Sequence, residues 1–219
     1  LNEIKRYFRD LNSDLHKLKE DSNVLCDEIA LEVSQLDPII DELQLRMKQI
    51  RMLPVGNLFE TMPRLVRDIA VSQSKMVELK ISGEETEVDK KVLESIKASL
   101  IHLLRNSVDH GIEPPQERFT SGKGAKGTIH LRSYHKGGNV VIEIEDDGRG
   151  INPEKIKETA LRRGLTSANE LATMSENEIM GFIFYPGFST APIITDISGR
   201  GVGLDVVKTD IEALKGSVL

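Results

Sequence analysis

Five polar residues near the middle of the chain have the types and spacing to handle phosphate and a divalent cation. They are His102, Arg105, Asn106, Asp109 and His110, and they fall in a segment that predicts a helix. At helical spacing all but Arg105 share one side of that helix. An Asn oxygen suits Mg²⁺ beside phosphate oxygens, and Arg and His can face phosphate charge. A solvated helix face explains the same row equally well, so this segment alone leaves both interpretations open.

A second group, Asp146-Asp147-Gly148-Arg149-Gly150, directly follows an apolar segment that predicts a strand over 140–145. A carboxylate fixed at a strand end can accept a hydrogen bond from an exocyclic amine, and glycines let the backbone approach a flat ring. A plain turn built from Asp and Gly is the alternative.

A third group lies near the end of the chain, where a glycine-rich segment opens a predicted helix. Its members are Gly199, Arg200, Gly201, Val202 and Gly203. Glycine-rich backbone at a helix N-terminus predicts an anion site. It lacks the Gly-Lys-Ser/Thr ending of a Walker A loop, and too little chain follows for a dinucleotide fingerprint.

These groups need elements that position them, and the sequence predicts helices over 57–74, from Asp89 to about His110, at Asn152-Pro153, over 175–185 and from about Val202 to Lys215. Alternating or apolar segments predict strands over 76–81, 127–134 and 139–145, with a turn at Gly137-Gly138-Asn139. Residues 217–219 begin a further strand-like segment.

Residues 1–52 differ from the rest, because they lack glycine and repeat apolar residues every three or four positions. This heptad-like stripe cannot bury itself and needs another helix. We expect a turn at residues 21–23 or at Asp37-Pro38, because proline inside a helix costs about 3 kcal/mol. Residues 52–56 predict a linker.

Composition narrows the function classes. The chain has 219 residues and a formal net charge of −6, which argues against nucleic acid as the main partner. The single Cys26 excludes a disulfide framework and a cysteine-rich zinc site. No segment has the length and apolarity of a membrane span, and no signal peptide is evident, so we expect a cytoplasmic protein.

The ordered set of motifs is more specific than any one of them. "HLLRNSVDHGIE", "IEDDGRGI" and "GFSTAPIITDISGRGVGLDVV" resemble the boxes of the GHKL ATPase superfamily, and within it the chemotaxis (CheA-type) histidine autokinases. The resemblance covers about residues 40–219. It implies an α+β two-layer sandwich, the Bergerat or GHKL ATP-binding fold, over 53–219. A helical hairpin over 1–52 would precede it and pair with its twin as a dimeric four-helix bundle.

The resemblance also implies roles at the first two boxes. Asn106 would bind the Mg²⁺ that bridges the ATP phosphates, and His102 would lie near the γ-phosphate. The same pocket would be lined by Arg105, Asp109 and His110. Asp146 rather than Asp147 would read the adenine amine, with Gly148 and Gly150 beside the base.

Further implied contacts are to phosphate. Lys155 would reach toward it, and the last glycine-rich box would hold it. Residues of about 185–200 would form the ATP lid. The implied nucleotide contacts in the lid and the last box are Ser189, Thr190, Gly199, Arg200, Gly201, Val202 and Gly203.

The implied reaction is transfer of the γ-phosphate from Mg-ATP to a histidine on a separate phosphotransfer domain, and then to a response regulator. None of the five histidines carries the acceptor box of an ordinary sensor kinase. Two other classes remain: a GHKL ATPase that hydrolyses ATP, and a dimeric scaffold without activity. His102 stands where hydrolysing members carry Glu, and the intact boxes count against the scaffold.

The resemblance implies that further C-terminal strands of the sheet, and a coupling domain for receptor and adaptor, lie beyond residue 219. We therefore expect reduced stability for the chain as given.

Overall fold

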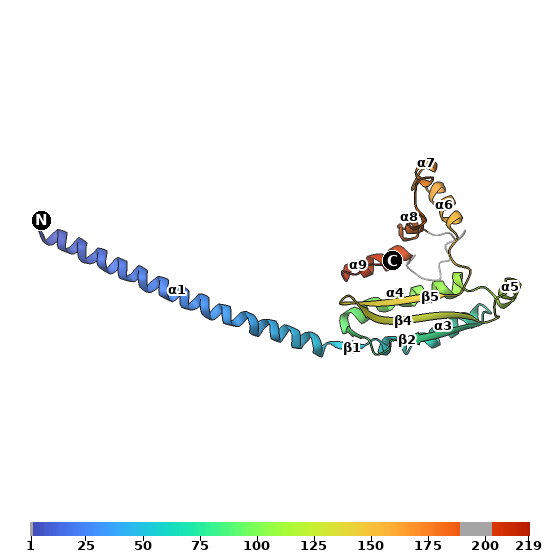
Figure 1. Cartoon of the computed structure of the whole chain (residues 1–219), viewed down its shortest axis with the longest axis horizontal. Helices are drawn as coiled ribbons and strands as arrows, with labels where there is room; N and C mark the ends of the chain where they lie inside the picture. Colours follow the sequence, from blue (N-terminus) through green and yellow to red (C-terminus); the bar gives the residue numbers. More distant parts are fainter. Residues whose placement is uncertain (1, 189–202) are drawn as a thin grey trace. The chain divides into compact units, whose positions relative to one another are not determined.

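The computed structural model describes residues 2–188 and 203–219, apart from some side chains in the first helix (Figure 1). The chain divides into two compact units, Leu1–Arg51 and Met52–Leu219.

The first unit is a single helix, α1 (Asn2–Ile50), which runs through Pro38 without a break. The predicted hairpin is therefore wrong for this structure, at residues 21–23 and at Pro38 alike. The reason lies in the pattern, because the apolar spacing continues across both positions and glycine occurs at neither. Proline removes one helical hydrogen bond, and the turns on either side keep theirs.

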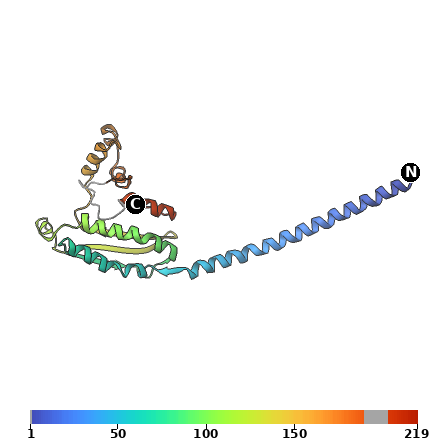
Figure 2. The same cartoon turned by 180° about the vertical axis from the view of Figure 1, so that it is seen from behind.

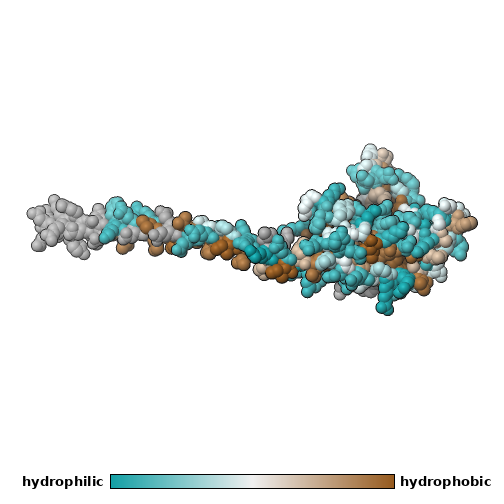
Figure 3. Space-filling view, turned by 60° about the horizontal axis from the view of Figure 1, so that its bottom comes forward, coloured by the Kyte–Doolittle hydropathy of each residue, from teal (hydrophilic) through white to brown (hydrophobic). Residues whose placement is uncertain are grey.

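The helix α1 exposes an apolar stripe, visible in Figure 3 as brown residues among teal ones. The members whose side chains are described are 48 % to 82 % exposed, and they are Leu15, Leu18, Leu25, Ile29, Leu36, Ile40, Leu43, Met47 and Ile50. A helix that leaves such a stripe in water gains little from packing, so its stability depends on a covering partner.

The second unit is built on a three-stranded mixed sheet in the order β2-β4-β5. The strand β2 (Val77–Ser82) runs parallel to β4 (Gly127–Lys136), which pairs antiparallel with β5 (Asn139–Asp146). Two short strands, β1 (Met52–Pro54) and β3 (Glu87–Asp89), form a separate antiparallel pair.

Helices α3 (Met62–Ser72) and α4 (Lys90–Asn106) cover one face of this sheet, as the opposite views of Figures 1 and 2 show. This is the α+β layering that the resemblance implied. The core between the layers includes the fully buried Ile129 and Leu131 of β4 and Leu104 of α4. Alternate residues of β4 face away from this core, as the period of a strand requires.

The remaining elements extend this framework. They are α2 (Gly56–Phe59), a π-helical turn (Ser107–Gly111), α5 (Pro115–Thr120), α6 (Pro153–Arg162), α7 (Ala168–Leu171), α8 (Glu176–Met180), a 3₁₀ turn (Gly181–Phe184) and α9 (Leu204–Ala213). A second apolar cluster joins α6, α7, α8 and the 3₁₀ turn through residues such as Ile156, Ile179 and Phe182.

Local signals in the sequence account for most of these elements. Asp89 caps α4 by accepting from the Lys91 N–H, and Asn152 caps α6 by accepting from Glu154. Gly137 and Gly138 take positive φ between β4 and β5, as the predicted turn needs. Residues 217–219 form no strand, which differs from the prediction.

None of the helices described is both long enough and apolar enough to cross a membrane.

The start of β4 supplies a test of the packing. A Cβ at Gly127 would lie 2.6 Å from Cγ2 of Ile112, which is fully buried. We expect Gly127→Ala to lower the free energy of unfolding by about 1–3 kcal/mol, because the packed core must give way. Urea denaturation measures this change. Gly124→Ala is the control, since a Cβ there meets nothing within 4 Å, and an equal loss in both variants would contradict the packing argument.

Candidate functional site

The last turn of α4 brings His102 and Asn106 together. Asn106 Nδ2 lies 3.0 Å from His102 Nε2, and both side chains are half-buried. Burial lowers the pKa of His102, and the nearby Arg105 guanidinium lowers it further, against smaller opposing effects of Asp205 and Asp109. The imidazole is therefore neutral near pH 7. A neutral His102 accepts the Asn106 N–H at Nε2, so Oδ1 of Asn106 remains available to a cation.

Beyond Asn106 the chain leaves α-helical geometry and forms the π-helical turn Ser107–Gly111. Lys75 holds this turn by donating to the carbonyls of Val108 at 2.7 Å and Asp109 at 2.8 Å. Gln73 donates to the Asp109 carboxylate. Burial lowers the pKa of Lys75, which Asp109 partly offsets.

This turn changes the predicted row of polar residues. The α-helical spacing holds for His102 and Asn106 and ends there, because π turns are wider than α turns. Asp109 is half-buried with its carboxylate on Gln73, whereas His110 is exposed. No local signal predicted the π turn, since the residues that stabilise it come from the segment between α3 and β2.

The end of β5 packs against the end of this turn. Arg149 N donates to the Gly111 carbonyl at 3.0 Å. A Cβ at Gly148 would lie 2.2 Å from that same carbonyl oxygen, and one at Gly111 would lie 2.8 Å from Asp146 Oδ1. Glycine is therefore required at both positions if Asp146 is to keep this place.

The two neighbouring aspartates differ in their partners. Asp147 Oδ1 accepts from Thr128 N at 2.9 Å, and both its carboxylate oxygens accept from Arg118 at 3.0 Å. In the described part of the chain, the Asp146 carboxylate accepts only from Gly148 N, at 3.1 Å. Asp146 thus keeps more acceptor capacity for a ligand than Asp147, whose carboxylate already accepts three bonds.

A partly buried cluster of charged residues, which sequence reasoning missed, includes Asp147, whose own side chain is 45 % exposed. Arg118 is 2 % exposed and the Glu113 side chain 8 %, and Lys123 completes the group. Burial opposes ionisation of Glu113 and Asp147. Hydrogen bonds and the charges of Lys123 and Arg118 outweigh it, so that the pKa of both carboxyls is lowered.

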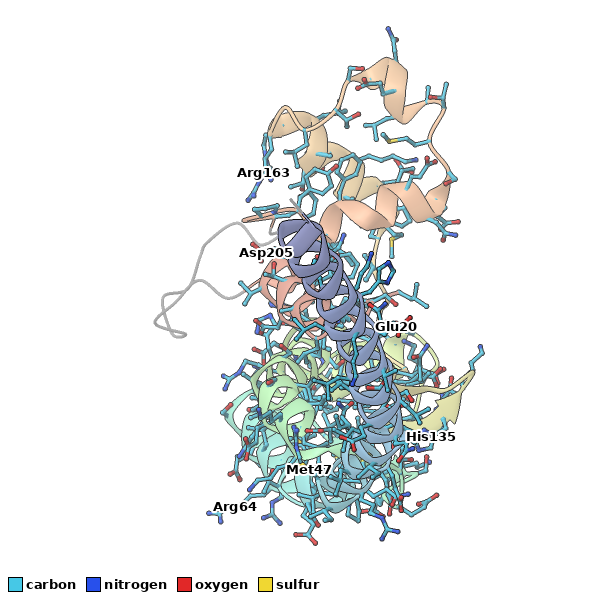
Figure 4. The ribbon with its side chains drawn as sticks, turned by 90° about the vertical axis from the view of Figure 1, so that its left-hand side faces the viewer. Glu20, Met47, Arg64, His135, Arg163 and Asp205 are labelled. Carbon is cyan, nitrogen blue, oxygen red and sulfur yellow. The ribbon has the colours of Figure 1, made fainter. Side chains whose placement is uncertain are left out.

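The helix α9 approaches the same end of α4. Ser99 Oγ donates to Asp210 Oδ2 at 2.9 Å, and Asp205 in the first turn of α9 acts on the charge of His102. Gly187 N donates to Asp205 Oδ2 at 3.2 Å, and the Gly187 carbonyl accepts from Arg163. Figure 4 labels Arg163 and Asp205. Gly203 lies directly before α9.

The structure does not bring the other described residues that are predicted to contact the nucleotide into bonds with α4 or β5. Lys155 is exposed in the first turn of α6, and no bond within the described residues joins its side chain to α4 or β5. Gly150 takes a φ of +67°. Outside the described residues lie Ser189, Thr190, Gly199, Arg200, Gly201 and Val202.

The partly buried cluster predicts a pH dependence of stability. The lowered pKa values of Glu113 and Asp147 lie below their ordinary values of 4.5 and 3.8. Their stabilisation is complete above about pH 4.5 and is lost as the pH falls through the lowered folded-state values. We expect Glu113→Gln to lower the melting temperature at neutral pH and to shrink its further fall in acid.

Thermal unfolding followed by circular dichroism between neutral pH and about pH 3 measures both effects. Glu143→Gln is the control, because it removes a half-exposed carboxylate on the outer face of the sheet. An unchanged acid-induced fall in Glu113→Gln would contradict the assignment.

Comparison with known proteins identifies the family. Residues 95–219, more than half of the chain, match the family described as histidine kinase-, DNA gyrase B-, and HSP90-like ATPase. The chain is 44 % identical, over its whole length, to "Chemotaxis protein CheA" of Bacillus subtilis, and covers 33 % of that protein. It is 45 % identical over 90 % of its length to "Sensor histidine kinase CheAY" of Helicobacter pylori, covering 25 % of it.

A third relative is the "Gliding motility regulatory protein" of Myxococcus xanthus, 39 % identical over 99 % of the chain and 28 % of the relative. The chain thus spans a third or less of the length of these relatives. The chain therefore belongs to the family of histidine kinase-, DNA gyrase B- and HSP90-like ATPases, as a homologue of its CheA-type members.

Proposed function

We propose that this chain binds Mg-ATP and transfers the γ-phosphate to a histidine on a separate phosphotransfer domain, in chemotaxis-type two-component signalling. The observation that carries the proposal is the juxtaposition of two groups through Gly111. An Asp146 carboxylate with remaining acceptor capacity lies against Gly111 and Gly148. The His102–Asn106 pair lies on the turn of α4 that leads into Gly111.

Asp146 suits the recognition of adenine. Adenine presents an exocyclic amine, which is a hydrogen-bond donor, and a carboxylate is an acceptor only. A Cβ at Gly148 or at Gly111 would collide with the Gly111 carbonyl or with this carboxylate, so the two glycines allow Asp146 to take its place. Asp147 suits the same role less well, because its carboxylate already accepts three bonds from Arg118 and Thr128.

Asn106 suits a cation that is held mainly by phosphate. Within residues 2–188 and 203–219 no group of three or more His, Cys, Asp or Glu side chains could hold a metal ion. A single hard oxygen from Asn106 fits Mg²⁺, which takes one or two protein ligands and the rest from phosphate and water. When bound, Mg²⁺ would neutralise charge on the phosphates.

The transfer itself needs positioning and charge stabilisation from the protein. A histidine nitrogen attacks the γ-phosphorus, the N–P bond forms as the bond to the bridging oxygen breaks, and ADP leaves. Arg105 and Lys155 are the cations proposed to face the phosphates. The neutral His102 fixes the Asn106 amide.

The acceptor histidine comes from another domain in this proposal. His102 is half-buried and bonded to Asn106, and His16 is exposed on α1. His130 and His135 belong to β4. A response regulator would take the phosphate from the acceptor domain, and receptor and adaptor would act through regions beyond this chain.

Hydrolysis of ATP is the second candidate reaction. It needs a group that activates water, and the position one turn before Asn106 is occupied by His102. The Nε2 of this neutral imidazole is engaged by the Asn106 amide. The site therefore favours transfer to a histidine over transfer to water.

Incubation of the chain with labelled ATP, Mg²⁺ and a histidine phosphotransfer domain tests the proposal. We expect acid-labile, base-stable label on that domain. Asn106→Asp should abolish transfer, and Asp146→Asn should raise the KM for ATP, because the amide has no negative charge and offers the adenine amine one acceptor oxygen instead of two. Glu143→Gln, a like exchange of carboxylate for amide on the outer sheet face, should leave both unchanged.

Three outcomes would contradict parts of this proposal. Free phosphate without labelled domain would make the chain a hydrolase, and the absence of both would make it a scaffold. Full transfer by Asn106→Asp would remove the Mg²⁺ assignment.

We also propose that the apolar stripe of α1 pairs with a second copy of the chain. Leu36→Glu with Ile40→Glu places two charges in this stripe and should convert a dimer to a monomer in sedimentation equilibrium. Ser34→Glu is the control, because two residues along a helix turn through about 200°, which puts Ser34 opposite Leu36. A dimer that survives the double substitution would show that the stripe does not form the interface.

A further inference from the structure

We propose that the partly buried charge cluster, made of Glu113, Arg118, Lys123 and Asp147, positions the Asp146 carboxylate and thereby sets the preference for adenine over other purines. This inference rests on the proposed function, and it assigns a role to residues outside the nucleotide boxes. Its members act through Asp146, so they are positioning residues.

Arg118 is the centre of the cluster. It is 2 % exposed, and its Nε donates to the Gly124 carbonyl at 2.7 Å. Its two terminal nitrogens donate to the two carboxylate oxygens of Asp147, each at 3.0 Å. A planar guanidinium that binds a carboxylate through two parallel bonds fixes both its distance and its orientation. Arg118 thus anchors the residue that follows Asp146.

Lys123 holds the next part of the same turn. Its Nζ donates to the Asp147 carbonyl at 3.0 Å and to the Gly148 carbonyl at 2.7 Å. Its third donor goes to Glu113 Oε1, also at 3.0 Å. The ammonium is therefore fully used within the cluster.

The charges of the cluster compensate one another. Glu113 accepts from Arg118 at 3.2 Å as well as from Lys123, so each carboxylate has a cation and each cation a carboxylate. A buried pair of this kind is costly to form, and removing one partner leaves a buried charge without compensation. One member of the cluster, Asp147, directly follows Asp146 in the chain, which points to a gain other than stability.

In this proposal the cluster fixes the direction of the Asp146 carboxylate. Its only bond in the described part is to Gly148 N at 3.1 Å, and Gly148 is held in turn by Lys123. Hydrogen bonds weaken steeply as their angle departs from linear, so a small rotation of this turn would misdirect the acceptor. The side chain that would read the base has no rigid support of its own and takes it from Arg118 and Lys123.

Purine discrimination is the property that depends on this direction. Adenine offers a donor at its exocyclic amine, whereas guanine and hypoxanthine offer a carbonyl oxygen at the same position. A well-placed carboxylate bonds the first and repels the second. A loosely held carboxylate bonds the amine more weakly and repels the carbonyl oxygen more weakly. Loosening the turn should therefore weaken ATP binding and barely change ITP binding.

The test compares ATP and ITP binding to the full chain by titration calorimetry, together with KM and kcat for phosphotransfer. We expect Arg118→Lys to reduce the affinity for ATP about tenfold and to shrink the ATP/ITP ratio, because lysine keeps the charge and loses the paired geometry. The rate at saturating ATP should change little. Arg132→Lys is the matched control, since Arg132 pairs with Glu143 and Glu145 on the outer sheet face.

Lys123→Gln is the test variant if Arg118→Lys does not fold. The Lys123 side chain is 34 % exposed, and its loss leaves the Arg118–Asp147 pair intact. It should lower the ATP/ITP ratio in the same direction. A ratio equal to that of the wild type in a folded variant overturns the inference, and so does an equal loss of affinity for both nucleotides. Wild-type protein that binds neither nucleotide overturns the proposed function instead.

Discussion

The proposed site depends on the close approach of two backbone segments, the π-helical turn after α4 and the turn after β5. The contact between them consists of the Arg149 N–H on the Gly111 carbonyl and the packing of Gly148 and Asp146 against Gly111. Neither segment could move by the width of a methyl group without losing this contact. The contact therefore couples the helix that carries Asn106 to the strand that carries Asp146.

The cationic side chains around this contact leave the Asp146 carboxylate and the Asn106 oxygen available to a ligand. Lys75 is used on the carbonyls of the π turn, and Lys123 and Arg118 are used on the turn after β5. Their charges stabilise backbone carbonyls and the Asp147 carboxylate, and none of these three described side chains bonds to Asp146 or Asn106. A net charge of −6 is then compatible with an anionic ligand, because the local pattern of donors decides binding.

Local signals in the sequence predicted the elements of the second unit well, and tertiary interactions explain what they missed. The Asp89 and Asn152 caps and the Gly137-Gly138 turn are local, so they could be read directly. The π turn depends on Lys75, which lies more than thirty residues from its acceptors. Arg118 lies in a polar segment typical of a surface helix, and only the fold shows that it is buried.

The failed hairpin prediction has a physical explanation that also bears on pairing. Pro38 follows Leu36 by two residues, and this spacing turns through about 200° of helix. Proline therefore lies on the face opposite the apolar stripe, and the helical hydrogen bond that it removes lies on that face too. Long helices curve with their convex side toward solvent, where hydrogen bonds lengthen. A proline on the outer face is consistent with such a curve, so Pro38 can remain inside one continuous helix.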